Sequence, residues 1–141
     1  MIEIRESVLN PFEELQRFQR QLETKGKYGA NVSFVGTVRD FNDGKPVETM
    51  TLEHYVGMTE NHLERIVAEA RKRWDLIDVL IIHRIGTLKP NDDIVLTAVW
   101  AAHRAEAFEA CRYLIEELKN RAPFWKKEQG VGATHWVERN N

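Results

Sequence analysis

A cluster of basic residues next to a proline is the clearest candidate for chemistry in this 141-residue chain. The segment 119–127 contains four Lys or Arg residues and no Asp or Glu, and Pro123 interrupts it. Lysines held close together lower each other's pKa, because each charge disfavours the other. A lysine tuned in this way can act as an acid, a base or a nucleophile near neutral pH. Lys119 and Lys126, on either side of the proline, are therefore candidate catalytic residues.

A simpler interpretation of this segment stays open. Basic residues are common at the solvated C-terminal end of a helix, where they complement the helix dipole. The aromatic pair Phe124-Trp125 favours a binding site, because fixed positive charges beside aromatic surface suit a flat, phosphorylated ligand. The same pair could equally pack in the core, so these residues alone do not decide between the two interpretations.

Further candidate anion-binding residues lie elsewhere in the chain. His103 and Arg104 stand where an apolar strand is expected to lead into a helix, and free N–H groups at a helix start favour anions. Arg104 adds a guanidinium that can bind a phosphate or carboxylate with two hydrogen bonds. The alternative, a His that caps the helix beside a solvated Arg, has equal weight. Arg39 precedes an expected turn at Asp43-Gly44 and could reach into a pocket, although most such residues are surface charges.

Metal and thiol chemistry are not expected. The remaining histidines show no metal-ligand spacing and no HExxH motif, and we interpret them as structural or surface groups. They are His54, His62, His83 and His135. The single cysteine, Cys111, falls on an apolar helical stripe and is predicted to be a small core residue, not a nucleophile.

Composition limits the class of protein. Hydrophobic residues make up 43% and charged residues 30%, which suits one globular domain over residues 1–141. The net charge of −2 gives no general attraction to nucleic acid or anionic lipid, so any anion binding must be local. No apolar run is long enough to cross a membrane and the N-terminus has no signal-peptide pattern. A cytoplasmic protein is expected.

The first half of the chain reads as strand, helix, strand, strand and helix. Asn10 and Pro11 begin the first helix, with Phe12, Leu15, Phe18 and Leu22 expected on its apolar face. The alternating segment 30–39 is followed by a turn, and 47–55 is expected to be the returning strand. Thr59 is expected to cap the second helix, whose apolar stripe comprises Leu63, Ile66, Val67, Ala70 and Trp74.

The second half predicts two apolar strands, a helix and a last strand. The strands are expected at 78–84 and 94–101, with a loop over 86–93 between them. The third helix is expected over 103–121, ended by Pro123, and the last strand over 134–137. Its inner face should carry Phe108, Cys111, Ile115 and Leu118. The whole pattern predicts a single α+β domain with three helices and a mostly antiparallel sheet.

The third helix imposes a geometric constraint. His103 and Lys119 are sixteen residues apart, which in a continuous helix is roughly 24 Å. One small-ligand pocket cannot contain both ends of this helix. Either only one end is functional, or one copy of the chain supplies His103 and Arg104 and another supplies Lys119 and Lys126. The second option predicts a homodimer with two composite sites.

Five segments in order resemble the family of large, catalytic subunits of molybdopterin synthase. The match extends from about residue 30 to residue 137, and is weak over the first thirty residues. The segments are Gly36-Thr-Val-Arg39, Leu52-Glu-His-Tyr-Val-Gly-Met-Thr59, Ile82-His-Arg-Ile-Gly86, Ala102-His-Arg104 and Leu118-Lys-Asn-Arg-Ala-Pro-Phe-Trp-Lys-Lys-Glu128. Val56 and Ile115 stand where proline and methionine are common in the family, and both keep the apolar character.

The resemblance implies a fold, a reaction and a partner. It implies an α/β-hammerhead-type fold and a homodimer in which each copy binds one small, ubiquitin-like sulfur carrier, giving a heterotetramer. The carrier's C-terminal Gly-Gly thiocarboxylate would enter a pocket and convert cyclic pyranopterin monophosphate to molybdopterin. No metal or redox cofactor is implied. Sulfur arrives on a partner, consistent with a chain whose one cysteine faces the core.

The resemblance also implies roles for individual residues. Lys119 and Lys126 would be the catalytic lysines near the thiocarboxylate, where cationic groups stabilise developing carboxylate and thiolate charge. Substrate binding would fall to Arg39, His103 and Arg104 at the pterin phosphate, with Lys127 and Glu128 completing the segment. Phe34 and Ile115 are candidate walls of the pocket.

Two other classes of function were weighed. A nucleotide- or RNA-binding module could use the basic residues of 119–127, but the balanced charge and the lack of a longer basic stripe count against it. A scaffold could bind a ubiquitin-like protein without turnover. Replacing Lys119 with Ala separates the scaffold from the enzyme, because only the enzyme would lose its function.

Overall fold

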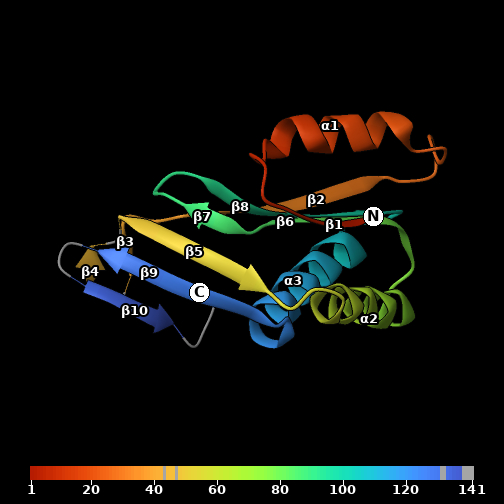
Figure 1. Cartoon of the computed structure of the whole chain (residues 1–141). Coiled ribbons are helices and arrows are strands. Elements are labelled where there is room, and N and C mark those ends of the chain that lie inside the picture. The colour runs from red at the N-terminus through yellow and green to blue at the C-terminus, as the bar shows by residue number, and fades with distance from the viewer. Residues whose placement is uncertain (43, 47, 131–132, 138–141) are drawn as a thin grey trace.

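Two four-stranded sheets and three helices make up the described part of the chain (Figure 1). The computed structural model describes residues 1–42, 44–46, 48–130 and 133–137, with the backbone only at 41, 42, 45, 125, 127–130 and 133–137. The helices are α1 (Pro11–Gln21), α2 (Met58–Arg73) and α3 (Arg104–Arg121). None of these three helices is long and apolar enough to span a membrane.

The first sheet forms the centre of the molecule and has helices on both faces. Its strands, in order, are β1 (Ile2–Arg5), β6 (Leu76–Arg84), β8 (Asp93–Ala101) and β2 (Ala30–Thr37). α1 covers one face and α2 and α3 cover the other (Figure 1). β6 and β8 are nearly continuous apolar runs because both of their faces are buried.

The second sheet lies beyond one end of the helices. Its order is β10 (Ala133–Val137), β9 (Phe124–Gly130), β5 (Thr49–His54) and β7 (Gly86–Leu88). A separate small hairpin pairs β3 (Phe41–Asn42) with β4 (Lys45–Pro46). β1 and β6 are parallel, and the other paired strands of the described residues are antiparallel. The predicted α+β class, its three helices and its mostly antiparallel pairing are confirmed.

One glycine lets the chain pass from the first sheet to the second. β6 ends at Arg84 and β7 begins at Gly86, which has a φ of +90°. A side chain is strained at that angle, so glycine suits the bend. Gly86 then pairs with Leu52 of β5. The end of β6, including His83, is thereby brought beside the second sheet.

α3 and β2 run in the same direction across the first sheet. β8 ends at Ala101, α3 begins at Arg104, and the helix returns over β8 and β2 (Figure 1). β2 is antiparallel to β8, so the C-terminal ends of β2 and α3 lie toward the same end of the sheet. This arrangement decides which of the candidate residues can meet.

Most of the predicted elements are confirmed, but two aromatic residues were misplaced. Leu15, Phe18 and Leu22 of the first helical face pack in the core, whereas Phe12 is 73% exposed. On α3, Phe108 is 62% exposed, and its expected place is filled by Ala107 and other small or aliphatic residues. Close packing of α3 on the sheet favours small side chains there, and the aromatic ring lies outside the contact.

Three further expectations were wrong in detail. The strand expected at 47–55 does not return beside β2; β5 belongs to the second sheet, and residue 47 lies outside the described residues. The expected loop over 86–93 begins with the short strand β7. The cap of α2 is Gly57, at a φ of +84°, and the Thr59 side chain accepts a hydrogen bond from the N–H of Tyr55 instead.

Candidate active site

Lys119 and Lys126 are brought together at the junction of α3 and β9. Lys119 lies on the last turn of α3 and is half-buried, while Lys126 in β9 is only 8% exposed. The pKa of Lys119 is lowered from 10.5 to about 8, chiefly by burial and in addition by the nearby charge of Lys126. The predicted effect of one lysine on the other is thus present in the folded chain for Lys119.

A tight turn reverses the chain between the two lysines. The N–H of Ala122 donates to the carbonyl of Leu118, and the N–H of Phe124 donates to the carbonyl of Ala122. The buried hydroxyl of Thr59, in α2, donates to the carbonyl of Pro123 at 3.0 Å. The turn is therefore fixed to α2 as well as to the end of α3.

The strand register places Lys126 on the buried face of the second sheet. Lys126 pairs with Leu52 of β5, which is 2% exposed, and Phe124 pairs with His54. Directly opposed residues share a face, and alternate residues along a strand return to it. Phe124 and Lys126 consequently lie on the same face as His54 and Leu52.

His83 is a buried residue close to Lys119, and it was not recognised from the sequence as part of the site. His83 has no exposed surface, and its ring stacks on Phe124 with centroids 4.0 Å apart and planes 18° apart. The pKa of His83 is lowered to about 3, chiefly by burial and in addition by the charges of Lys119 and His54, while the hydrogen bond to Arg84 opposes this shift. The sequence offered only its place in an apolar strand as a signal, which predicted burial but not this contact.

Not every cation of the predicted cluster remains available for a ligand. Arg121 forms ion pairs with Glu117 at 2.7 Å and with Glu69 at 3.1 Å. Tyr113 also donates a hydrogen bond to Glu69. Arg121 therefore helps to fasten α3 to α2 and is committed to protein contacts.

The structure separates His103 and Arg104 from the lysines of the same chain. α3 is continuous from Arg104 to Arg121, so the expected separation of roughly 24 Å between His103 and Lys119 holds. His103 occupies the N-cap position, but its side chain makes no capping hydrogen bond. The alternative interpretation is therefore correct in the position of His103 at the start of the helix, but not in a capping contact of its imidazole. Both His103 and Arg104 are exposed.

Arg39 lies toward the lysine end of the sheet. It follows β2 directly after the buried Val38, and β2 and α3 point the same way. Its side chain is exposed and takes part in no ion pair among the described residues. Arg39 is thus separated from His103 and Arg104 within one chain, although all three were predicted to hold one phosphate.

The two candidate pocket walls line one open cavity. A hollow of about 280 Å³ between β2 and α3 is bordered by Phe34, Ile115 and the exposed Phe108. Ile115 precedes Lys119 by four residues. Residues at i and i+4 lie on the same face of a helix, so these two side chains share a face of α3. Ile115 thus joins this cavity to the helix face of Lys119, although neither Lys119 nor Lys126 lines the cavity itself.

Lys127 and Glu128 are placed by their backbone alone. Lys127 pairs with Thr51, and Glu128 pairs with Met50. Their side chains lie outside the described part of the structure, so their predicted contribution to substrate binding stays a prediction.

Cys111 is a core residue, as predicted. It is 3% exposed, its thiol donates weakly to the carbonyl of Thr97 at 3.7 Å, and burial raises its pKa to about 11. A thiol that is protonated at neutral pH is a poor nucleophile. Within the described residues, no group of three or more His, Cys, Asp or Glu could hold a metal ion.

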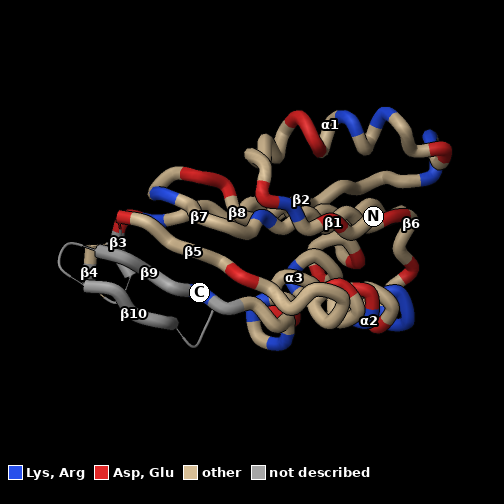
Figure 2. Tube along the Cα trace, viewed as in Figure 1, with Lys and Arg blue, Asp and Glu red and all other residues tan. Residues whose placement is uncertain are grey.

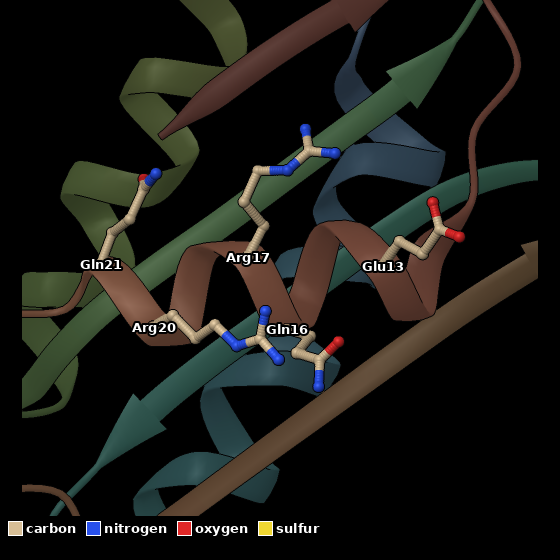
Figure 3. Close-up of a pocket in the computed structure, with 5 residues that line it drawn as sticks. All are labelled: Glu13, Gln16, Arg17, Arg20 and Gln21. Atoms are coloured by element: carbon tan, nitrogen blue, oxygen red, sulfur yellow. The ribbon is translucent and has the colours of Figure 1, made fainter.

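Two surface features do not form a site. A hollow of about 330 Å³ on α1 is lined only by side chains of that helix, which spread apart along it (Figure 3). They are Glu13, Gln16, Arg17, Arg20 and Gln21. Acidic and basic residues occur together on each of the three helices (Figure 2). The charges of these helices are therefore nearly balanced, which does not favour an RNA-binding module.

Comparison with known proteins matches this arrangement to one family. The family model described as "MoaE protein" matches residues 8–121. A molybdopterin synthase catalytic subunit from Ralstonia nicotianae is 58% identical over 110 residues, which span 78% of this chain and 62% of that protein. The Pseudomonas aeruginosa protein of the same name is 47% identical over 137 residues, spanning 97% of this chain and 89% of its own length.

A solved structure gives the same result for the fold. The molybdopterin biosynthesis MoaE protein from Burkholderia ambifaria superposes with a TM-score of 0.81 at 44% identity, covering 97% of this chain and 88% of that one. The fold and these sequence matches agree. The chain belongs to the MoaE protein family.

Proposed function

We propose that this chain is the catalytic subunit of a molybdopterin synthase. In this function it transfers sulfur from the C-terminal thiocarboxylate of a small, ubiquitin-like carrier to cyclic pyranopterin monophosphate, forming the dithiolene of molybdopterin. Its relatives bear the name of this enzyme. The reaction is proposed to take place in the cytoplasm, and the chain to act without a cofactor of its own.

The observation that carries this proposal is the pair Lys119 and Lys126. With a pKa near 8, Lys119 is about one-tenth neutral at pH 7, roughly 300 times the neutral fraction of an ordinary lysine. It can therefore exchange a proton during sulfur transfer. Lys126, buried beside it, supplies positive charge where carboxylate and thiolate charge develops.

The surrounding residues suit a substrate with a flat ring and a phosphate. Phe34 and Ile115 border the cavity that Ile115 joins to the helix face of Lys119, and apolar walls favour a ring system. Arg39 lies toward the same end and can bind a phosphate with two hydrogen bonds. Lys127 and Glu128 would complete the binding segment.

His103 and Arg104 fit the proposal only if two chains form each site. The uncapped start of α3 retains free N–H groups, and Arg104 beside it adds a guanidinium. A homodimer can bring these groups together. In it, the start of α3 of one protomer, with His103 and Arg104, lies beside Lys119 and Lys126 of its partner. With one carrier bound to each copy, the assembly is a heterotetramer.

A reconstitution tests the proposed function directly. The purified chain, the carrier with a C-terminal thiocarboxylate and cyclic pyranopterin monophosphate are mixed, and mass spectrometry scores the dithiolene product. Product should require all three components, and the carrier with an ordinary C-terminal carboxylate is the control. A chain that binds the carrier but yields no product would be a scaffold, and the proposed function would be wrong.

A further inference from the structure

Four residues from two strands and one helix connect the buried core to the lysine pair. His83 comes from β6, Phe124 and Lys126 from β9, and Lys119 from α3. His83 alternates with Val79 and Ile81, which pack in the core under α2 and α3. Its ring therefore faces the same helical layer that carries Lys119. The proposed reaction assigns no role to His83.

The hydrogen bonding of His83 fixes which of its nitrogens carries the proton. Nδ1 lies 2.8 Å from the carbonyl oxygen of Arg84. A carbonyl only accepts, so Nδ1 donates and the neutral ring leaves Nε2 without a proton. Nε2 is buried and has no hydrogen-bond partner among the described residues. The ring is thus anchored by one edge and presents an uncharged face to Phe124.

Phe124 connects the anchored ring of His83 to β9, the strand that carries Lys126. It is the first residue of β9, its ring stacks on His83, and Lys126 follows two residues later on the same face. Stacked ring pairs stabilise their arrangement beyond the area that they bury. The stack therefore limits how far the start of β9, and Lys126 with it, can move from α3.

We propose that His83 is a positioning residue for the lysine pair. Its buried ring, anchored to the carbonyl of Arg84, holds Phe124 and thereby fixes Lys126 beside Lys119. His83 touches neither substrate nor carrier in this role. The inference rests on the proposed function for its catalytic consequence, but the geometry that it describes can be measured without turnover.

The charged groups around Lys119 make its protonation a sensitive probe of this geometry. Lys126 faces it from β9, while His83 and His54 lie on β6 and β5. Glu60 of α2 lies 3.5 Å from His54, and Glu116 precedes Lys119 on α3 itself. If Lys126 moves away and water enters, both causes that lower the pKa of Lys119 weaken, so this pKa must rise.

Two substitutions at His83 separate the stack from the hydrogen bond. His83→Phe keeps a ring over Phe124 but loses the donor to Arg84, whereas His83→Asn keeps an N–H near the position of Nδ1 but loses the ring. The readout is acylation of Lys119 by an amine-reactive ester as a function of pH, with the modified lysine located by mass spectrometry. A rise of one pKa unit from 8 reduces the neutral fraction at pH 8 from about one-half to about one-tenth.

The expected result is a fivefold slower acylation of Lys119 at pH 8 in His83→Asn, with a smaller effect in His83→Phe, which keeps the stack but loses the anchoring hydrogen bond. In the reconstituted reaction, kcat of His83→Asn should fall with little change in KM, because the lysines are misplaced while the binding groups remain. Equal acylation midpoints in all three proteins would overturn the proposal. A shift in His83→Phe but not in His83→Asn would overturn it too, because the hydrogen bond and not the stack would then matter.

A second pair of variants tests the stack in case the substitutions at the buried His83 prevent folding. Phe124→Leu removes the other ring of the stack, and Phe124→Tyr keeps it. Phe124→Leu should shift the acylation midpoint upward and Phe124→Tyr should not; the reverse, or no shift, contradicts the proposal. If the wild-type chain made no dithiolene but these shifts appeared, the proposed function would fail while the positioning role of His83 survived.

Discussion

Lys119 is the residue on which turnover should depend most. Lys119→Ala removes the proton-exchanging amine and should lower kcat about 100-fold or more. Lys119→Arg should not restore it, because a guanidinium keeps its proton at any accessible pH. Lys126→Ala should also lower kcat. The reconstituted reaction with each variant measures this effect, and wild-type turnover in Lys119→Ala would remove Lys119 from the mechanism.

The same lysine makes stability depend on pH. The folded pKa of Lys119 lies near 8, below its ordinary value of 10.5, so the folded chain loses this proton before the unfolded chain does. The free energy of unfolding must therefore rise as the pH increases from 8 to about 10.5, because the unfolded chain binds this proton more tightly over that range. Below pH 8 the buried charge costs stability in full.

Lys119→Met abolishes this dependence. The free energy of unfolding, measured by urea denaturation at several pH values, should favour Lys119→Met at pH 7, and the advantage should shrink toward pH 10. Lys72→Met, at an exposed position on α2, reports any general effect of replacing a lysine. A difference between wild type and Lys119→Met that stays constant with pH would show that burial does not perturb Lys119.

Cys111 should be dispensable for sulfur transfer. Its thiol is buried and its pKa is raised to about 11, so it neither attacks nor carries sulfur at neutral pH. Cys111→Ala should keep wild-type turnover and cost about 1 kcal/mol of stability, a typical loss for a small core truncation. Turnover and urea denaturation test the two parts separately. Loss of turnover at wild-type stability would assign Cys111 a chemical role.

At the scale of elements, one hydroxyl joins α2 to the turn between α3 and β9. Thr59 is fully buried, accepts from the N–H of Tyr55 and donates to the carbonyl of Pro123. Thr59→Val removes both of these hydrogen bonds and should cost about 1–3 kcal/mol. It should also lower kcat, because the turn positions both lysines.

Two control variants complete this test. Thr59→Ser keeps the hydroxyl and should recover most of the loss. Thr51→Val removes a hydroxyl whose contact with Thr87 is exposed, so it should be nearly silent. Thermal unfolding and turnover of the three variants are compared. Equal destabilisation by Thr59→Val and Thr51→Val would mean that the contact with Pro123 contributes nothing specific.

Sequence patterns predicted the helices and strands that have long apolar stripes or runs. They failed where packing between elements decides which segment forms a strand or which side chain is buried. α2, β6 and β8 were correct because long apolar stripes or runs leave little choice of structure. Strand β9 was not recognised, because the sequence after Pro123 is basic and polar and its pairing with β5 is made at long range. Helical periodicity likewise could not show that Phe108 lies outside the contact between α3 and the sheet.

The residues of the candidate site were likewise predicted only where the signal is local in the sequence. Lys119 and Lys126 were found because their types, their number and the proline between them are visible locally. The stack of His83 on Phe124 was not, because it exists only once the bend at Gly86 brings β6 beside the second sheet. A contact between residues 41 positions apart leaves no periodic signal in the chain.

At the scale of the whole molecule, the two ends of α3 can act on one small substrate only if a second chain takes part. His103 lies roughly 24 Å from Lys119 along a continuous helix, so one protomer cannot place both groups on one small substrate. If each site combines His103 and Arg104 of one protomer with the lysines of its partner, defects in different protomers must complement each other.

Hybrid dimers test this directly. Homodimers of His103→Ala and of Lys119→Ala should both be impaired, each in both sites. In a mixed dimer, one site receives both defects and the other receives none, so about one-quarter of wild-type turnover should return in a random mixture, in which half the dimers are hybrids with one intact site each. If both groups belonged to sites within one chain, every site in the mixture would keep a defect. Turnover would then stay at the average of the two parent variants, and the composite site would be excluded.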